Sequence, residues 1–402
     1  MANTLTFAQI STILNSVHNQ ATGNTALAAT NSAEFVSQAQ TALLAGYDTV
    51  LNAINQVLTR TIFSIRPYSA KFRGMEVSEA AWGNHVRKLS IADKPFEDDE
   101  RYKWPVGYDV TQTVPTGDGQ AVDMYKINKP LIQQTNFYGS SVYQEHVTVF
   151  RDQLQQAFQG PDEFGSFTSL IMTNRSDKLE QARENLARAT LCNLITAINA
   201  EANTDRVIHL LTEYNTATGL SLTATTVYQP ANFKAFIQWM YARIATIASL
   251  MTERSSMYQT VINSLPINRH TPYQDMRVYL YAPARYQSDM MALADVYHDS
   301  YLRLADNETV NFWQSIKTPD SIQQTASYIN SSGVVQTTAG TTALDNVLGV
   351  IFDREAAGFA VTQAWSQATP FNAAGGYSNI FDHATLRCYN DMTEKAVILL
   401  LD

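Results

Sequence analysis

The chain has 402 residues and a formal net charge of −9, which argues against a surface that coats nucleic acid. Only 16% of its residues are charged, compared with about 25% in typical globular proteins. This composition favours a chain that buries much of its exterior against other subunits, because interface cores are depleted of charge.

The sequence shows neither a targeting or membrane-spanning segment nor a disulfide framework, and both absences bear on where the protein is made. The N-terminus lacks the basic start and apolar run of a signal peptide, and no window approaches the roughly 18 consecutive apolar residues of a membrane span. The two cysteines, Cys192 and Cys388, are too few for a disulfide framework and are expected as free thiols in a reducing compartment. We therefore expect a protein made in the cytosol.

The first 59 residues form an almost neutral segment, in which Glu34 and Asp48 are the only charged side chains. Apolar residues recur at helical spacing over residues 7–17 and again over 35–54, and the small polar stretch between them predicts a flexible connection. Two amphipathic helices with so little charge need a surface to pack on. We therefore expect residues 1–60 to form an N-terminal arm.

Residues 71–130 have the opposite character. They hold 9 Lys or Arg and 10 Asp or Glu, and 4 of the chain's 12 prolines. The two ends, at residues 75–91 and 121–139, have the pattern of strands, in which proline is confined to edges and bulges. A two-stranded ribbon is marginal by itself in water. A long charged hairpin over residues 75–140 is therefore expected to dock on a neighbouring subunit.

The candidate contact residues lie within this hairpin. Two tryptophans lie near either end of its most charged part, residues 85–105, in which a basic pair precedes a run of four acidic residues. If the basic section of one copy faces the acidic section of another, the charges would set register and partner choice more than affinity. The predicted subunit-interface residues are Trp82, Arg87, Lys88, Glu97, Asp98, Asp99, Glu100 and Trp104.

A long helical pattern follows, from about residue 165 to 202, with Ser166 predicted as its N-cap. At 1.5 Å per residue such a helix would span roughly 50 Å, far more than an average helix. We interpret it as a strut. Charge pairs at helical spacing support it, namely Glu180–Arg183 and Glu184–Arg188.

The second half alternates helices and strands. Residues 231–252 have the periodicity of a helix, and residues 276–297 predict a strand followed by a helix that starts at Pro283. Residues 347–359 predict an apolar strand that runs into a short helix. Residues 383–402 predict two strands around a turn, the last one buried on both faces. This order is typical of an α+β domain.

The sequence lacks a constellation for enzyme chemistry. Four consecutive acids at 97–100 point in different directions and are best interpreted as a solvated loop. The seven histidines are scattered without metal-ligand spacing, Gly117 and Gly119 lack the context of a phosphate loop, and neither cysteine lies in a nucleophile motif. We predict no catalytic, cofactor-binding or metal-binding residues and no cofactor.

The order of these parts resembles the Hong Kong 97-type major capsid proteins of tailed bacteriophages, most closely those of small short-tailed phages. The resemblance covers essentially the whole chain as an order of parts. It is carried by "TFAQISTIL" at 6–14, "SAKFRGMEVS" at 69–78, "YQEHVTVFRDQLQQAF" at 143–158, the 165–202 helix, and "PFNAAGGYSNIFDHATLRCYNDMTEKAVILLL" at 370–401.

The resemblance implies an α+β, Hong Kong 97-type capsid fold with five parts. They are an N-terminal arm at 1–60, a peripheral domain at 61–74 and 141–230 with the spine helix at about 165–202, an extended loop at 75–140, an axial domain at 231–378, and returning C-terminal strands at 379–402. Such subunits form hexamers and pentamers that close an icosahedral shell around double-stranded DNA, in virions assembled in the host bacterial cytoplasm.

The resemblance also implies partners. Some members of this family begin with a charged, cleavable scaffolding segment, and the nearly neutral N-terminus here departs from that pattern. We therefore expect a separate scaffolding protein, together with a portal, nonspecifically held DNA and possible cement proteins. The Lys–Asn cross-link of some members is not carried over, because no lysine here has spacing that marks it.

Two other interpretations stay open at this point. An encapsulin-like nanocompartment would use the same fold to hold enzyme cargo. A cytosolic hydrolase would use carboxylates near Asp98 and Glu100, and would be a monomer or a small oligomer. A tail or fibre protein is disfavoured, because the sequence has neither repeats nor coiled-coil heptads.

Overall fold

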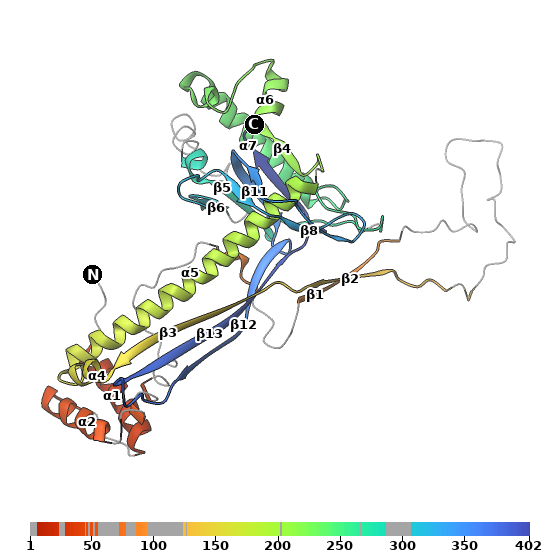
Figure 1. Cartoon of the computed structure of the whole chain (residues 1–402). Coiled ribbons are helices and arrows are strands. Elements are labelled where there is room, and N and C mark those ends of the chain that lie inside the picture. The colour runs from red at the N-terminus through yellow and green to blue at the C-terminus, as the bar shows by residue number, and fades with distance from the viewer. Residues whose placement is uncertain are drawn as a thin grey trace, which may run out of the picture.

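The computed structural model shows three parts: an α+β body, a long helix with a three-stranded sheet alongside it, and a thin ribbon that leaves to one side (Figure 1). Element labels follow Figure 1. The structure describes residues 6–23, 29–44, 46, 49–50, 53–54, 72–77, 86–94, 124–125, 127–201, 203–265, 267–286 and 307–402.

The longest element is helix α5, Pro161–Glu201, with 41 residues and a length of about 60 Å. It confirms the predicted strut, but Ser166 lies inside the helix, so its prediction as the N-cap is wrong. The helix begins earlier because a proline suits the first turn, where Asp162 and Glu163 also complement the helix dipole. Both predicted charge pairs form, at 2.9 Å for Glu180–Arg183 and 2.7 Å for Glu184–Arg188.

A long antiparallel sheet runs beside α5 (Figure 1). Its order is β12-β13-β3, with β3 at Ser140–Phe150, β12 at Ala357–Ala368 and β13 at Tyr377–Asn390. The predicted short helix after residue 353 is wrong. Residues 354–356 form a turn, in which the Ala356 N–H donates to the Asp353 carbonyl at 2.8 Å. The following chain is a strand because it pairs with β13 along its length, and this tertiary pairing overrides local helix preference.

The body is built on a five-stranded sheet of order β4-β14-β11-β5-β6. Its C-terminal strand β14, Ala396–Leu400, is buried on both faces, as predicted. Ile398 and Leu400 pack into the core that includes the end of α5, while Val397 and Leu399 pack into the core formed with α6 and α7. The other strands are β4 at Val207–His209, β5 at Met276–Tyr281, β6 at Asn307–Val310 and β11 at Val347–Asp353.

The remaining elements cover this body and connect it. The predicted helix at 231–252 is α7, Pro230–Thr252, and residues 282–286 are helical as predicted around Pro283. The others are α4 at Arg151–Ala157, α6 at Leu210–Thr218, the 3-10 turns η1 at Arg73–Met75 and η3 at Thr226–Tyr228, and two small hairpins, β7 (Ile322–Gln324) with β10 (Thr342–Leu344) and β8 (Ser327–Ile329) with β9 (Val335–Thr337).

The N-terminal segment contains the two expected helices, α1 at Phe7–Thr22 and α2 at Ser32–Leu44. They pack in a core with the beginning of α5 and the far end of the long sheet. The approach is close at Gly165, where an added Cβ would lie 2.7 Å from Ile10 Cδ1. The described part of this segment therefore packs on its own chain.

The ribbon consists of β1, Val86–Ile91, and β2, Ile132–Phe137, and extends away from the body (Figure 1). The strands are antiparallel, with Val86 opposite Phe137 and Ile91 opposite Ile132. Strands were predicted within residues 75–91 and 121–139, and this pairing confirms them over 86–91 and 132–137. Met75 lies in a 3-10 turn, residues 124–125 form a turn, and residues 78–85 and 121–123 lie outside the described residues. In the described parts of the chain, no helix is long and apolar enough to cross a bilayer.

Candidate assembly surfaces

The two faces of the ribbon differ, because successive side chains on a strand point in opposite directions. Arg87, Leu89 and Ile91 point to solvent, while Lys88 and its neighbours at alternate positions are partly covered by the body. Ile132, opposite Ile91 in the register, is exposed as well.

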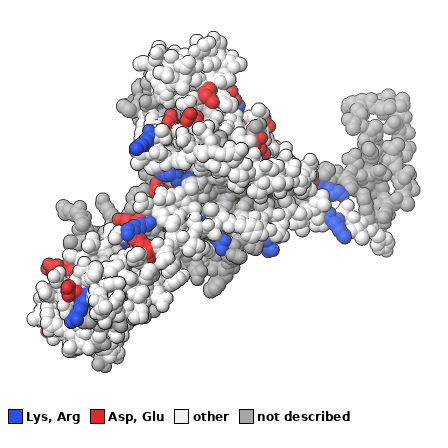
Figure 2. Space-filling model, viewed as in Figure 1, with Lys and Arg blue, Asp and Glu red and all other residues white. Residues whose placement is uncertain are grey.

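The outward face of the ribbon, defined here as Arg87, Leu89, Ile91 and Ile132, is unusually apolar for an exposed surface. Leu89, Ile91 and Ile132 are 56%, 63% and 60% exposed. Charge is sparse over the view in Figure 2, but Lys and Arg side chains stand on the ribbon. An apolar strip with one basic residue, on the face that points away from the body, is a surface suited to contact with another chain.

Lys88, on the inward face of the ribbon, meets a cluster of charged side chains of the body. We call this cluster the Lys88 centre: Lys88, Arg269, Glu355, Asp391 and Glu394. Lys88 Nζ lies 3.0 Å from Asp391 Oδ2 and 3.1 Å from Glu355 Oε2, and it also pairs with Glu394. Arg269 Nη1 lies 3.2 Å from Glu394 Oε1. One lysine of the ribbon thus contacts two separate turns of the body.

Burial determines the electrostatics of the Lys88 centre. Asp391 is 1% exposed and Glu394 4%, so burial raises the pKa of Glu394. Burial by itself would lower the pKa of Lys88, but Asp391, Glu394 and Glu355 outweigh it and raise that pKa above its ordinary value. Lys88 therefore stays cationic at neutral pH, and removing it would leave buried carboxylates without their main counter-charge.

The turn at 391–395, "DMTEK", connects still more of the body. Lys395 is fully buried and donates to the carbonyl of Glu253, just after α7, at 2.6 Å. Arg206, also fully buried, donates to the carbonyls of Met392 and Ala396 and to Glu201 at the end of α5. Sequence analysis missed this hub. The available signal was a charged turn directly before the buried final strand, because charges next to a buried strand require partners from elsewhere.

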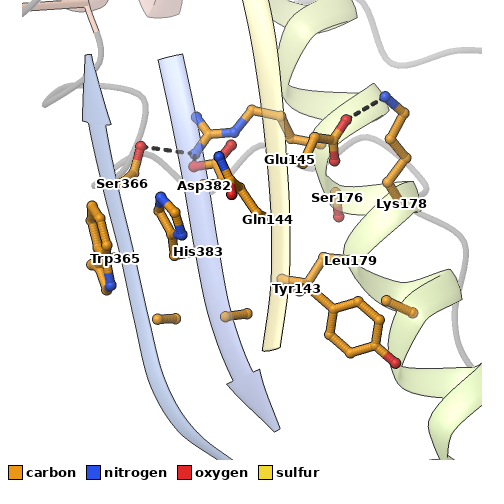
Figure 3. A pocket seen from close by; sticks show the side chains of 14 residues that line it. Tyr143, Gln144, Glu145, Ser176, Lys178, Leu179, Trp365, Ser366, Asp382 and His383 are labelled. Carbon is orange, nitrogen blue, oxygen red and sulfur yellow. Dashed lines mark hydrogen bonds and ion pairs between the residues drawn. The ribbon is translucent and has the colours of Figure 1, made fainter. Parts of the chain in front are cut away.

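A cavity of about 720 Å³ lies between α5 and the long sheet (Figure 3). Tyr143, Leu179 and small alanine side chains line it. Arg175 pairs with Asp382 beside it, and Lys178 of α5 pairs with Glu145 of β3. The middle of α5 is therefore held to the sheet by ion pairs, whereas both ends of α5 join apolar cores.

Aromatic rings also border this cavity. Trp365 and His383 stack with ring centroids 3.9 Å apart and planes at 15°, and Figure 3 shows them together on the β12 side. No group of three or more His, Cys, Asp or Glu in the described ranges could hold a metal ion. The cavity offers stacking and charge pairing, and its lining shows no grouping that defines a chemical reaction.

The structure separates the predicted contact residues. Arg87 points outward on the ribbon, whereas Lys88 is engaged by carboxylates of its own chain. The other six, namely Trp82, Glu97, Asp98, Asp99, Glu100 and Trp104, lie outside the described residues. Contact of these eight residues with another subunit stays a prediction.

Both cysteines are free, as expected. Cys192 lies on the buried face of α5, and burial raises the pKa of its thiol to about 12. Burial likewise raises the pKa of the half-buried Cys388. Neither thiol has the lowered pKa of a reactive cysteine.

The chain has similar structures among known proteins, although no curated protein matches its sequence. Among solved structures, it is similar to a chain from the capsid structure of Staphylococcus phage Andhra, with a TM-score of 0.51, 10% identity, and coverage of 85% of this chain and 87% of that one.

A chain from a structure of the head fibre and inner core protein gp22 of bacteriophage P68 gives a TM-score of 0.50, 9% identity, and coverage of 85% and 87%. These likenesses show a shared mixed helix-and-sheet fold. A family model described as the Phi29-like phage major capsid protein matches residues 10–400. The chain therefore belongs to the Phi29-like phage major capsid protein family and is a shell-forming component of a phage virion.

Proposed function

We propose that this capsid protein forms hexamers and pentamers that close an icosahedral shell around double-stranded DNA, and that the outward face of its ribbon lies on an adjacent subunit. The observation that carries the contact is the exposure of Leu89, Ile91 and Ile132 on the face of the ribbon that points away from the body. Two strands by themselves gain little from folding in water, so a neighbouring surface would stabilise them.

The proposal includes the Hong Kong 97-type division of the chain. The ribbon belongs to the extended loop at 75–140, α5 to the peripheral domain, and the sheet containing β14 to the axial body. The long α5 beside a three-stranded sheet and the compact body at its C-terminal end are consistent with that division. The boundaries between the parts remain those expected from the sequence.

The remaining partners follow from the same proposal. A separate scaffolding protein and a portal would act during assembly in the host cytoplasm, and cement proteins could bind the finished shell. DNA would be held weakly and without sequence preference, since the chain carries a net charge of −9 and packaged DNA brings its own counterions. The role proposed for the subunit is structural, without an enzymatic activity.

Deletion of residues 85–105 tests the ribbon contact. We expect the deleted chain to stay soluble and to form no closed shells under conditions in which the full chain forms them, as seen by negative-stain electron microscopy. Normal particles from the deleted chain would refute the contact. Nuclease-protected DNA in purified particles would distinguish a genome container from a nanocompartment that holds enzyme cargo.

A further inference from the structure

The ribbon joins the long sheet at a single glycine. Gly139 lies between β2 and β3, and an added Cβ there would come 2.5 Å from the carbonyl oxygen of Cys388. The Cys388 N–H donates to the Gly139 carbonyl at 3.2 Å. A residue without a side chain is therefore needed where the ribbon strand passes into the sheet, and this point is a tightly packed join that anchors β2.

The other strand of the ribbon is held by polar contacts with the body. The Lys88 centre is the most buried of them, and it joins β1 to the turn after β11 through Glu355 and to the 391–395 turn through Asp391 and Glu394. Arg269 reinforces the join, because its Nη2 donates to Ser90 Oγ of the same strand at 2.7 Å.

A packed join on β2 and a charged attachment on β1 together fix the direction in which the ribbon leaves the body. We propose that Lys88 is a positioning residue that fixes the angle between ribbon and body, and so sets the geometry in which each copy reaches its neighbour. This role acts within one subunit, unlike the neighbour contact predicted for Lys88 from sequence. The consequence for shell geometry rests on the proposed ribbon contact, whereas the angle itself does not.

Spin labels in the dilute, unassembled full-length chain test the angle directly. One label is placed on the ribbon at position 134 and one on α5 at position 174, both exposed, in a background with Cys388→Ser. We expect a single narrow distance peak for the parent chain and for Lys88→Arg. Lys88→Met should lose that peak and give a broad distribution, because the turns no longer attract β1.

Arg87→Met is the matched control, since it removes a cation from the adjacent position on the other face of β1. It should keep the narrow peak. If Lys88→Met fails to fold, combining it with Asp391→Asn and Glu394→Gln removes the uncompensated buried charges, and the broad distribution should appear in that triple variant.

A narrow, unshifted peak in the folded Lys88→Met chain or in the triple variant would overturn the proposal. Electron microscopy of the same variants adds the second readout: Lys88→Met should give particles of mixed size or shape where the parent gives uniform shells. A broad distance distribution with uniform shells would keep the positioning role and refute the ribbon contact, so the two failures are distinguishable.

Discussion

Replacing Ile91 on the outward face of the ribbon should weaken assembly by an amount that follows from its exposure. Full burial of such a side chain is worth about 1.5–3 kcal/mol. Because 63% of Ile91 is exposed in the single chain, covering it on a neighbour would contribute about 1–2 kcal/mol by the same rule. Threonine is also β-branched and keeps the strand preference. It loses most of the free energy gained by burying apolar surface, however, because its hydroxyl must be desolvated.

We therefore expect Ile91→Thr to raise the critical concentration for assembly by roughly 5–30-fold, since 1.4 kcal/mol corresponds to a factor of ten. Ile91→Val is the matched control. It removes one methylene, worth about 0.8 kcal/mol when fully buried, and should raise the critical concentration only about twofold. Light scattering over a dilution series measures both values, and thermal unfolding of the unassembled chain should be nearly unchanged.

Equal critical concentrations for the parent chain and the threonine variant would refute the reasoning, because the outward face would then stay in solvent within the shell.

Two further predictions concern the folded subunit. In the free energy of unfolding, Gly165→Ala should gain about 1 kcal/mol from helix propensity but lose about 1–3 kcal/mol because the added methyl crowds Ile10. The gain should appear only when Gly165→Ala is combined with Ile10→Ala. Additive unfolding free energies in that double-mutant cycle would contradict the packing of α1 on α5. Burial lowers the pKa of Lys395 to about 8 from 10.5, so Lys395 should add about 3 kcal/mol of stability as pH rises across that window. The thiols of Cys192 and Cys388, whose pKa values are raised by burial, lower stability over the upper part of the same window. Urea unfolding at both ends of the window should give a change in stability that is about 3 kcal/mol more positive for the exposed-lysine control Lys317→Met than for Lys395→Met. Equal changes in the two variants would show that Lys395 does not titrate in this window.

The repeat of apolar residues along the sequence was enough to predict individual helices and strands. The strut, the ribbon strands and the buried final strand all follow from patterns within short windows, and all three are present. The start of α5 was harder, because Pro161 with its acidic neighbours and Ser166 are competing start signals. The turn at 354–356 was missed because Arg354, Glu355 and Ala356 all favour a helix locally, while pairing of the following strand with β13 decides the outcome.

The partners of the charged side chains could not be predicted from a short stretch of sequence, because they lie far away along the chain. Strand alternation places Arg87 and Lys88 on opposite faces of β1, but it does not say which face meets the body. That is decided by turns at 354–356 and 391–395, hundreds of residues further along the chain. The partners of Lys88 could therefore not be predicted from the hairpin sequence, even though its charge marked it as a contact residue.

Electron cryomicroscopy of particles assembled from the full chain tests the central claim most directly. The account predicts closed shells in which Leu89, Ile91 and Ile132 of each copy are covered by an adjacent copy. Shells in which these three side chains face solvent, or a chain that stays a single compact molecule at concentrations that favour assembly, would contradict it.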